Sequence, residues 1–217
     1  MPSALGRFWE REVLSRALEH GMRGVEPIRA ELAGQAQGRV LELGIGTGAS
    51  LPHLGPEVEE VVAVEPAPEL AAIARIRLER WSVEHGRPAR LLEASASRPL
   101  PLDPGSFDTV LVLFVLCSID RLEQTLGQAH RLLAPRGTLL LAEHIAADDD
   151  PVPHPLRARA QRLLRPAWRL ALGGCDPHKS LGPALERCGF DATGLARREL
   201  DLPWLVRSGL VGRAARR

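Results

Sequence analysis

Short apolar runs alternate with helical hydrophobic spacing over the middle of the chain. Runs rich in Val and Leu are typical of buried strands, and apolar residues that recur every three or four positions indicate amphipathic helices. The predicted strands are 39–43, 61–64, 90–94, 107–116 and 138–142. The predicted helices are 51–54, 68–85 and 120–133. Strands alternating with helices predict βαβ units, and therefore an α/β fold with a doubly wound, mostly parallel sheet.

The two ends of the chain follow other patterns. Residues 8–33 carry apolar residues at helical spacing and predict an N-terminal helix. After a proline-rich loop, residues 156–172 predict an arginine-rich helix that Pro166 would kink, and 181–188 predict another. Segments 192–200 and 204–213 can pair as two final strands.

We therefore expect a single domain over residues 1–217. Its expected parts are an N-terminal helical segment (1–38), a core (39–147), a helical cap (148–190) and a C-terminal hairpin (191–217). Ligands of such sheets bind at the carboxyl ends of the strands, so functional residues should follow strands.

Composition is that of an ordinary globular domain, with 217 residues, 45% apolar and 25% charged. The chain contains no apolar run near the ~18 residues of a membrane span, and the first residues carry charges where a signal peptide is apolar. Its three cysteines are too few for a disulfide framework, and their linear spacing lacks the zinc patterns. We expect a cytoplasmic protein that binds no metal.

Charge is distributed unevenly, although the net charge is only +1. Residues 1–150 carry 15 basic residues against 22 acidic ones, whereas residues 151–217 carry 13 against 5. The basic helix 156–172 also carries leucines, so it predicts either a peripheral contact with an anionic membrane or a solvated face. Nucleic acid is not expected as a partner, because aromatic residues make up 4% and Tyr is absent.

A glycine-rich turn, Glu42-Leu43-Gly44-Ile45-Gly46-Thr47-Gly48, follows the first predicted strand directly. Glycines there allow a sharp turn and let a ligand approach main-chain N–H groups. Glu65 ends the next strand, where an acid can accept both hydroxyls of a ribose. The alternative is a structural turn and a chance acid. The GxGxG spacing disfavours a nicotinamide dinucleotide, whose fingerprint is GxGxxG.

The block 40–50, together with Glu65-Pro66, resembles motifs I and II of class I S-adenosylmethionine-dependent methyltransferases. Segments 106–108 and 132–137 are similar to later motifs of that family. The resemblance implies a Rossmann-like sheet of seven strands with the last antiparallel, and S-adenosyl-L-methionine as cofactor. The cofactor-binding residues that it implies are Glu42, Gly44, Ile45, Gly46, Gly48, Glu65, Pro66, Ala96, Ser97 and Leu113. Many relatives carry an acid or Asn where this chain has Ala96, Ser97 and Arg98.

A second resemblance extends through the last third of the chain. Segments 115–118, 143–144, 166–168, 174–175, 184–187 and 202–207 resemble the methyltransferase-like alkyl thiol S-methyltransferases and their bacterial relatives. This resemblance implies methyl transfer to a small apolar thiol. The alternatives are a phospholipid amine or a quinone-type carbon as acceptor, or a module that binds the cofactor without catalysis.

Methyl transfer from a sulfonium is an in-line displacement, for which alignment of the reactants supplies much of the rate. A thiol acceptor also loses a proton. Cys117, after the fourth predicted strand, and His144, at the end of the fifth, are the candidate catalytic residues. Each has a structural alternative, a small buried residue for Cys117 and a loop anchor for His144. Lesser candidates are Glu143 to orient His144, His178 as base, and Trp168 as a pocket wall.

Overall fold

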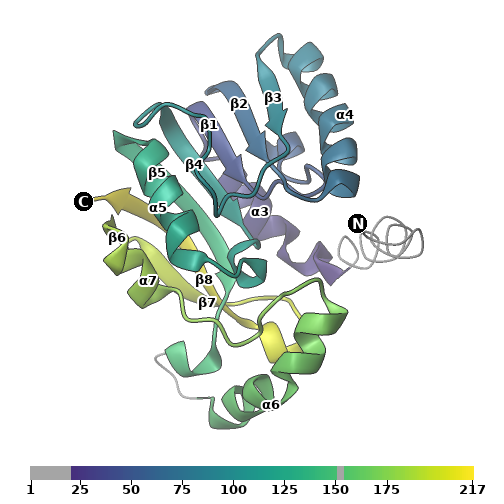
Figure 1. The fold of residues 1–217 in the computed structure, drawn as a ribbon, viewed down its shortest axis with the longest axis vertical. Helices are drawn as coiled ribbons and strands as arrows, with labels where there is room; N and C mark the ends of the chain where they lie inside the picture. Colours follow the sequence, from purple (N-terminus) through teal and green to yellow (C-terminus); the bar gives the residue numbers. More distant parts are fainter. Residues whose placement is uncertain (1–20, 151–153) are drawn as a thin grey trace.

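One mixed sheet organises the residues that the computed structural model describes, 21–150 and 154–217 (Figure 1). Its strands are β1 (Gly38–Leu43), β2 (Val58–Val64), β3 (Ala89–Leu92), β4 (Phe107–Leu113), β5 (Leu133–His144), β6 (Phe190–Asp191), β7 (Leu195–Glu199) and β8 (Ser208–Arg216). They lie in the order β3-β2-β1-β4-β5-β8-β6, and β7 also pairs with β8. Since β6 and β7 follow the same edge of β8 in two pieces, the sheet has the seven strand positions expected.

Strand direction confirms the expected fold class. Strands β3, β2, β1, β4 and β5 pair in parallel, as crossover connections require. Strand β8 pairs antiparallel with the second half of β5, from Thr138 opposite Ala215 to His144 opposite Gly209. The carboxyl ends of β1, β2, β4 and β5 therefore meet at one edge of the sheet.

Helices cover both faces of the sheet (Figure 1). The α-helices are α3 (Glu26–Ala33), α4 (Pro68–His85), α5 (Leu122–Leu132), α6 (Pro155–Ala171) and α7 (Gly182–Arg187). Short 3-10 turns are η2 (Arg23–Val25), η3 (Leu51–His53), η4 (Leu116–Ser118), η5 (Ala147–Asp149) and η6 (Trp204–Val206). Alternate strand residues pack against α5 and α7 on one face, in a core that includes Leu41, Leu126 and Leu185. The others pack against α3 and α4.

Local rules explain why α4 occupies the predicted range, 68–85. Pro68 stands at the start, where its missing N–H costs no hydrogen bond, and Gly86 ends the helix in the left-handed conformation with φ of 64°. Other boundaries differ from the prediction. Strand β4 ends at Leu113 because Phe114 has a φ of 58° and η4 follows. Residues 204–206 form η6, so the last strand begins only at Ser208. Of the helix predicted over 8–33, the part before residue 21 lies outside the described residues.

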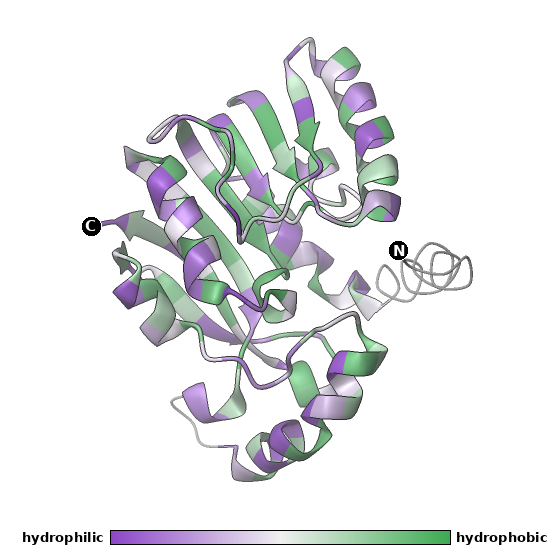
Figure 2. Cartoon of the chain, in the orientation of Figure 1, coloured by the Kyte–Doolittle hydropathy of each residue, from purple (hydrophilic) through white to green (hydrophobic). Residues whose placement is uncertain are grey.

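Helix α6 is continuous through Pro166, and its buried residues are Arg157, Ala158 and Gln161. Gln161 is buried; its Oε1 accepts the Ala147 N–H at 2.8 Å and its Nε2 donates to the Leu205 carbonyl at 2.8 Å. On the other side, Leu156, Leu163 and Leu170 are 73%, 80% and 90% exposed. Green and purple residues alternate along this helix in Figure 2. Among the described helices, none is both long and apolar enough to span a bilayer.

Candidate active site

The glycine loop follows β1 at the carboxyl edge of the sheet and makes a sharp turn there. The N–H groups of Gly44 and Ile45 both donate to the Val64 carbonyl, at 2.8 and 3.2 Å, which holds the loop against the end of β2. Gly44 has a φ of 73°, and a Cβ there would lie 2.2 Å from Cγ2 of Val115. Only glycine fits this position. The loop is thereby held close to the segment that follows β4.

Glu65 and the glycine loop are joined directly. The Glu65 carboxylate accepts the N–H of Gly46 at 3.0 Å and that of Ala67 at 2.9 Å. Burial raises the pKa of Glu65, and these two hydrogen bonds limit the rise. A Cβ placed on Gly46 would meet no atom within 4 Å, so the space above this glycine is open. An acceptor carboxylate beside open space fits the predicted contact with a ribose, which stays a prediction.

Glu42 lies inside the fold, next to this loop. Its side chain is buried and accepts a 2.5 Å hydrogen bond from the Ser50 hydroxyl. Burial raises the pKa of Glu42 to about 7, although the Ser50 hydrogen bond opposes the shift. The carboxyl group therefore keeps its proton to a higher pH than an exposed glutamate does. When protonated it can donate a hydrogen bond to a ligand at the loop, and when ionised it can accept one.

The other predicted cofactor residues lie around the same edge. Ile45, Gly48, Ala96 and Leu113 are buried, and Pro66 is exposed beside Glu65. Ser97 shares a 2.8 Å hydrogen bond with the Ser95 hydroxyl, so its own hydroxyl is already engaged. Their contacts with a cofactor stay predictions.

Phe114 is a feature that sequence reasoning missed. Among the described residues outside glycine, it alone has a positive φ, 58°, immediately after β4. Its N–H donates to the Ala142 carbonyl at 2.7 Å, and the Arg29 guanidinium lies 5.9 Å from its ring centre. Strain of this kind is common at ligand-binding sites, because neighbouring contacts must maintain it. It brings Val115 against the glycine loop and starts the turn that carries Cys117.

Two sulfur atoms and an imidazole form the second cluster at this edge. Cys117 lies in η4 after β4, His144 ends β5, and Cys175 lies in the loop between α6 and α7. One ligand atom from each lies within 4.8 Å of the others, and Nε2 of His144 is 3.2 Å from Sγ of Cys175. Cys117 and His144 are buried, and Cys175 is half-buried. The structure thus unites both predicted catalytic residues with a third that was not predicted.

Glu143 and Lys179 fix the backbone around this cluster. The buried Glu143 carboxylate accepts the N–H of Cys117 at 3.2 Å and that of His144 at 3.1 Å. The Lys179 ammonium donates to the carbonyls of Leu116, Cys117 and Ile119. Glu143 thus orients the turn at Cys117 as well as His144, and Lys179 holds the same turn from the cap.

Charge within the cluster favours an ion pair. The pKa of the Cys175 thiol is lowered, mainly by a hydrogen bond from the Cys117 thiol. Burial opposes this shift, and the nearby His144 adds to it. Burial alone would lower the pKa of His144, but the Cys175 sulfur and the Glu143 carboxylate outweigh it and raise that pKa. The pKa of Cys117 is raised well above its usual value by the same hydrogen bond and by burial. These shifts favour a thiolate at Cys175 beside a protonated His144.

Two lesser candidates divide between the cluster and the surface. Trp168 lies beside the cluster, where its Nε1–H points to Sγ of Cys175 at 3.4 Å. His178 pairs instead with Asp148, with 2.9 Å between Nε2 and Oδ1. The structure therefore gives His178 no contact with His144 or the cysteines. Sequence reasoning missed Cys175 and Lys179 as site residues, although Cys175 stood in a segment, 174–175, that carried the second resemblance.

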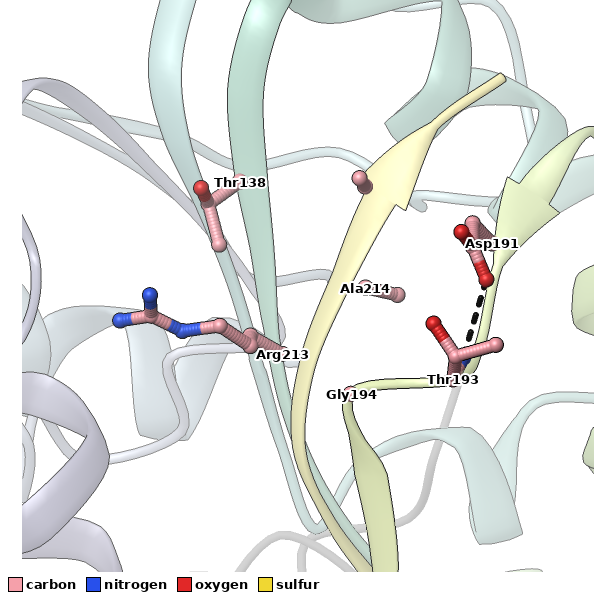
Figure 3. A pocket seen from close by; sticks show the side chains of 7 residues that line it. Thr138, Asp191, Thr193, Gly194, Arg213 and Ala214 are labelled. Carbon is pink, nitrogen blue, oxygen red and sulfur yellow. Dashed lines mark hydrogen bonds between the residues drawn. The ribbon is translucent and has the colours of Figure 1, made fainter.

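A surface pocket lies at the opposite edge of the sheet (Figure 3). It is lined by residues that include Thr138 in the middle of β5, where it pairs with Thr109 near the start of β4, Thr193, and Arg213 and Ala214 near the end of β8. Strand β8 is antiparallel, so these positions mark the amino edge of the parallel strands. Ligands of doubly wound sheets bind at the carboxyl edge. We therefore place the candidate site at the glycine loop and the cysteine–histidine cluster.

The chain is similar to known methyltransferases. A family model described as a methyltransferase domain matches residues 41–141. Human thiol S-methyltransferase TMT1A is 32% identical over 180 residues, covering 82% of this chain and 70% of TMT1A. The Cereibacter sphaeroides phosphatidylethanolamine N-methyltransferase is 31% identical, covering 53% of this chain and 55% of that protein. Demethylmenaquinone methyltransferase from Thermus thermophilus is 34% identical, with 62% and 53% covered.

The fold has close counterparts among solved structures. A Thermotoga maritima protein described as a SAM-dependent methyltransferase, possible histamine N-methyltransferase, aligns with a TM-score of 0.61 at 18% identity. The alignment covers 97% of this chain and 98% of that one. At this identity the likeness concerns the fold alone, and it extends over the cap as well as the core.

Proposed function

The chain belongs to the class I S-adenosylmethionine-dependent methyltransferases, and on this basis we propose that it methylates the sulfur atom of a small apolar thiol. The observation that carries the proposal is the extent of the similarity to human TMT1A. That similarity covers 82% of this chain, which is more than the methyltransferase domain model matches. Residues outside the cofactor-binding core form the acceptor pocket. Similarity that extends beyond this core therefore supports a similar acceptor.

The residues at the carboxyl edge suit the cofactor. Open space above Gly46, with the Glu65 carboxylate beside it, is suited to a ribose, and Glu42 lies by the loop for the polar methionine end. When bound, S-adenosylmethionine supplies an electrophilic methyl group. The chain's own task is to hold the acceptor in line with that methyl group and to keep water away.

The acceptor is proposed to lie between the glycine loop and the cap. Val115, which packs on Gly44, precedes Cys117 by two residues, so the loop and the cysteine–histidine cluster lie next to one another. Trp168 contributes an apolar ring on the cap side. A small apolar thiol would find there both an apolar wall and polar groups that can stabilise its thiolate.

Incubation with labelled S-adenosylmethionine and a panel of thiols, amines and phenols tests the acceptor. We expect label on alkyl thiols and little on the rest, with cofactor binding measured in parallel by calorimetry. Preferential labelling of phosphatidylethanolamine or a quinol would support the second candidate function, methylation of a phospholipid or a quinone-type substrate. The two bacterial relatives that suggest it cover 53% and 62% of this chain. Binding of the cofactor with no methylated acceptor would contradict the thiol proposal.

We also propose that the exposed row of leucines on α6 contacts a lipid surface. Residues 151–217 carry 13 basic against 5 acidic residues, which suits anionic headgroups. On α6, however, Arg162 pairs with Asp148, and Arg165 pairs with Asp176. Binding should therefore depend on the leucines more than on salt. Sedimentation with anionic vesicles should fall for Leu163→Glu and stay unchanged for Leu163→Met.

A further inference from the structure

We propose that Cys117, His144 and Cys175 bind a thiophilic divalent cation, for which Zn²⁺ is the appropriate probe. The site would have two sulfur ligands and one imidazole ligand, a set that zinc accepts readily. The sequence predicted no metal because the three residues are far apart along the chain. The fold brings them together from η4, the end of β5 and the loop before α7.

The geometry is close to that of a tetrahedral centre. Bonds of ~2.3 Å to sulfur and ~2.0 Å to nitrogen place ligand atoms roughly 3.5–3.8 Å apart. Here the three atoms lie within 4.8 Å of one another, and Nε2 of His144 is 3.2 Å from Sγ of Cys175. Side-chain movements of about 1 Å would complete the geometry.

The surroundings hold the three residues in place. Glu143 binds the N–H groups of both Cys117 and His144, so the ends of β4 and β5 are fixed relative to each other. The Asp176 N–H donates to the Cys117 carbonyl at 3.0 Å, which ties the Cys175 loop to η4. Supporting contacts of this kind orient ligands in metal sites. The cluster is therefore preorganised rather than a chance meeting of mobile side chains.

His144 presents Nε2 to the Cys175 sulfur. Its ring is buried, and Nδ1 has no hydrogen-bond partner, which leaves the Cys175 sulfur as the hydrogen-bond partner of the ring. A cation bound to Nε2 and to both sulfurs would replace this nitrogen–sulfur contact by coordinate bonds.

Three protein ligands leave one tetrahedral position free, as in catalytic rather than structural zinc sites. If the proposed thiol acceptor is correct, its sulfur can take that position. The S–H proton then passes to water as the metal–sulfur bond forms. The thiolate electron pair attacks the methyl carbon as the sulfonium C–S bond breaks, and the thioether product leaves the cation. This step rests on the proposed function, whereas the cation site does not.

Metal analysis of the full chain, purified reduced and without chelators, tests the site. We expect about one equivalent of zinc after dialysis against Zn²⁺, and a Co²⁺ form with thiolate-to-metal charge-transfer absorption and the strong visible bands of tetrahedral cobalt. Cys117→Ser and Cys175→Ser should each weaken zinc affinity at least about 100-fold in competition with a chromophoric chelator. Cys188→Ser is the matched control, because that sulfur contacts the Glu123 carbonyl away from the cluster.

The outcomes separate this site from the methyltransferase proposal. Reduced wild-type protein with three titratable thiols that takes up no zinc or cobalt would overturn the site. So would a Cys117→Ser variant, folded by circular dichroism, with unchanged zinc affinity. If a variant does not fold, the cobalt spectrum of the wild-type protein still tests the site. Stoichiometric zinc in a protein that methylates no thiol would retain the site and reject the acceptor.

Discussion

The glycine-loop region and the cap differ in how they hold their charged groups. Beside the loop, Glu42 and Glu65 are buried and bonded to a hydroxyl or to backbone N–H groups. In the cap, Asp148 and Asp176 bind arginine side chains of α6, some of them largely exposed. The first arrangement leaves carboxyl oxygens that a neutral ligand can use. The second holds surface segments together and has little to offer such a ligand. The carboxylates beside the loop are therefore better placed than those of the cap to contact the proposed cofactor.

Gly44→Ala should produce the largest change, because it disrupts the loop itself. The new Cβ would lie 2.2 Å from Cγ2 of Val115, and φ is 73°. Overpacking and left-handed strain together should cost about 3–5 kcal/mol of unfolding free energy, measured by urea denaturation. Gly86→Ala is the control. It shares a positive φ, 64°, but meets no atom within 4 Å, so about 1–2 kcal/mol is expected. Equal losses in both variants would contradict the steric argument.

Glu42 should make the stability of the cofactor-free protein depend on pH. Its folded pKa of about 7 lies above the ordinary 4.5, so the folded state retains a proton that the unfolded state has lost. Stability should therefore fall as pH rises from about 4.5 to 7, by up to about 3 kcal/mol. Glu42→Gln should remove most of that slope in urea denaturation at pH 5 and pH 7.5. A slope that persists in the variant would assign the effect to other groups.

Glu65→Ala should weaken S-adenosylmethionine binding about 10-fold or more by calorimetry, as expected for lost hydrogen bonds to a charged group. Glu57→Ala removes an exposed acid just before β2, at the other edge of the sheet, and should leave affinity unchanged. Unchanged affinity in Glu65→Ala would reject the predicted ribose contact.

Arg162→Gln should have the smallest effect. Its ion pair with Asp148 has side chains that are 51% and 43% exposed, and such pairs contribute about 0–1 kcal/mol. Thermal unfolding should therefore change little. Gln161→Leu, one residue earlier, removes the buried amide that binds Ala147 and Leu205 and should destabilise the protein more. A larger loss for Arg162→Gln would mean that surface charge holds the cap.

Features encoded locally were predictable, and features made by distant contacts were not. Proline and glycine set the ends of α4, and apolar runs identified the parallel strands, so the fold class follows from short segments. Phe114 ended β4 early because tertiary packing imposed a backbone conformation that its residue type disfavours. Cys175 joined His144 across 31 residues, a pairing that no linear spacing rule describes.

The way Lys179 is held has a practical consequence. It is the only lysine among 217 residues, and its ammonium binds three carbonyls of the turn at Cys117. An amine-selective reagent has this side chain as its one ε-amino target, and the reaction requires the ammonium to release those carbonyls. The rate of acylation at this single position would therefore report how often the cap separates from the strand ends, without any engineered label.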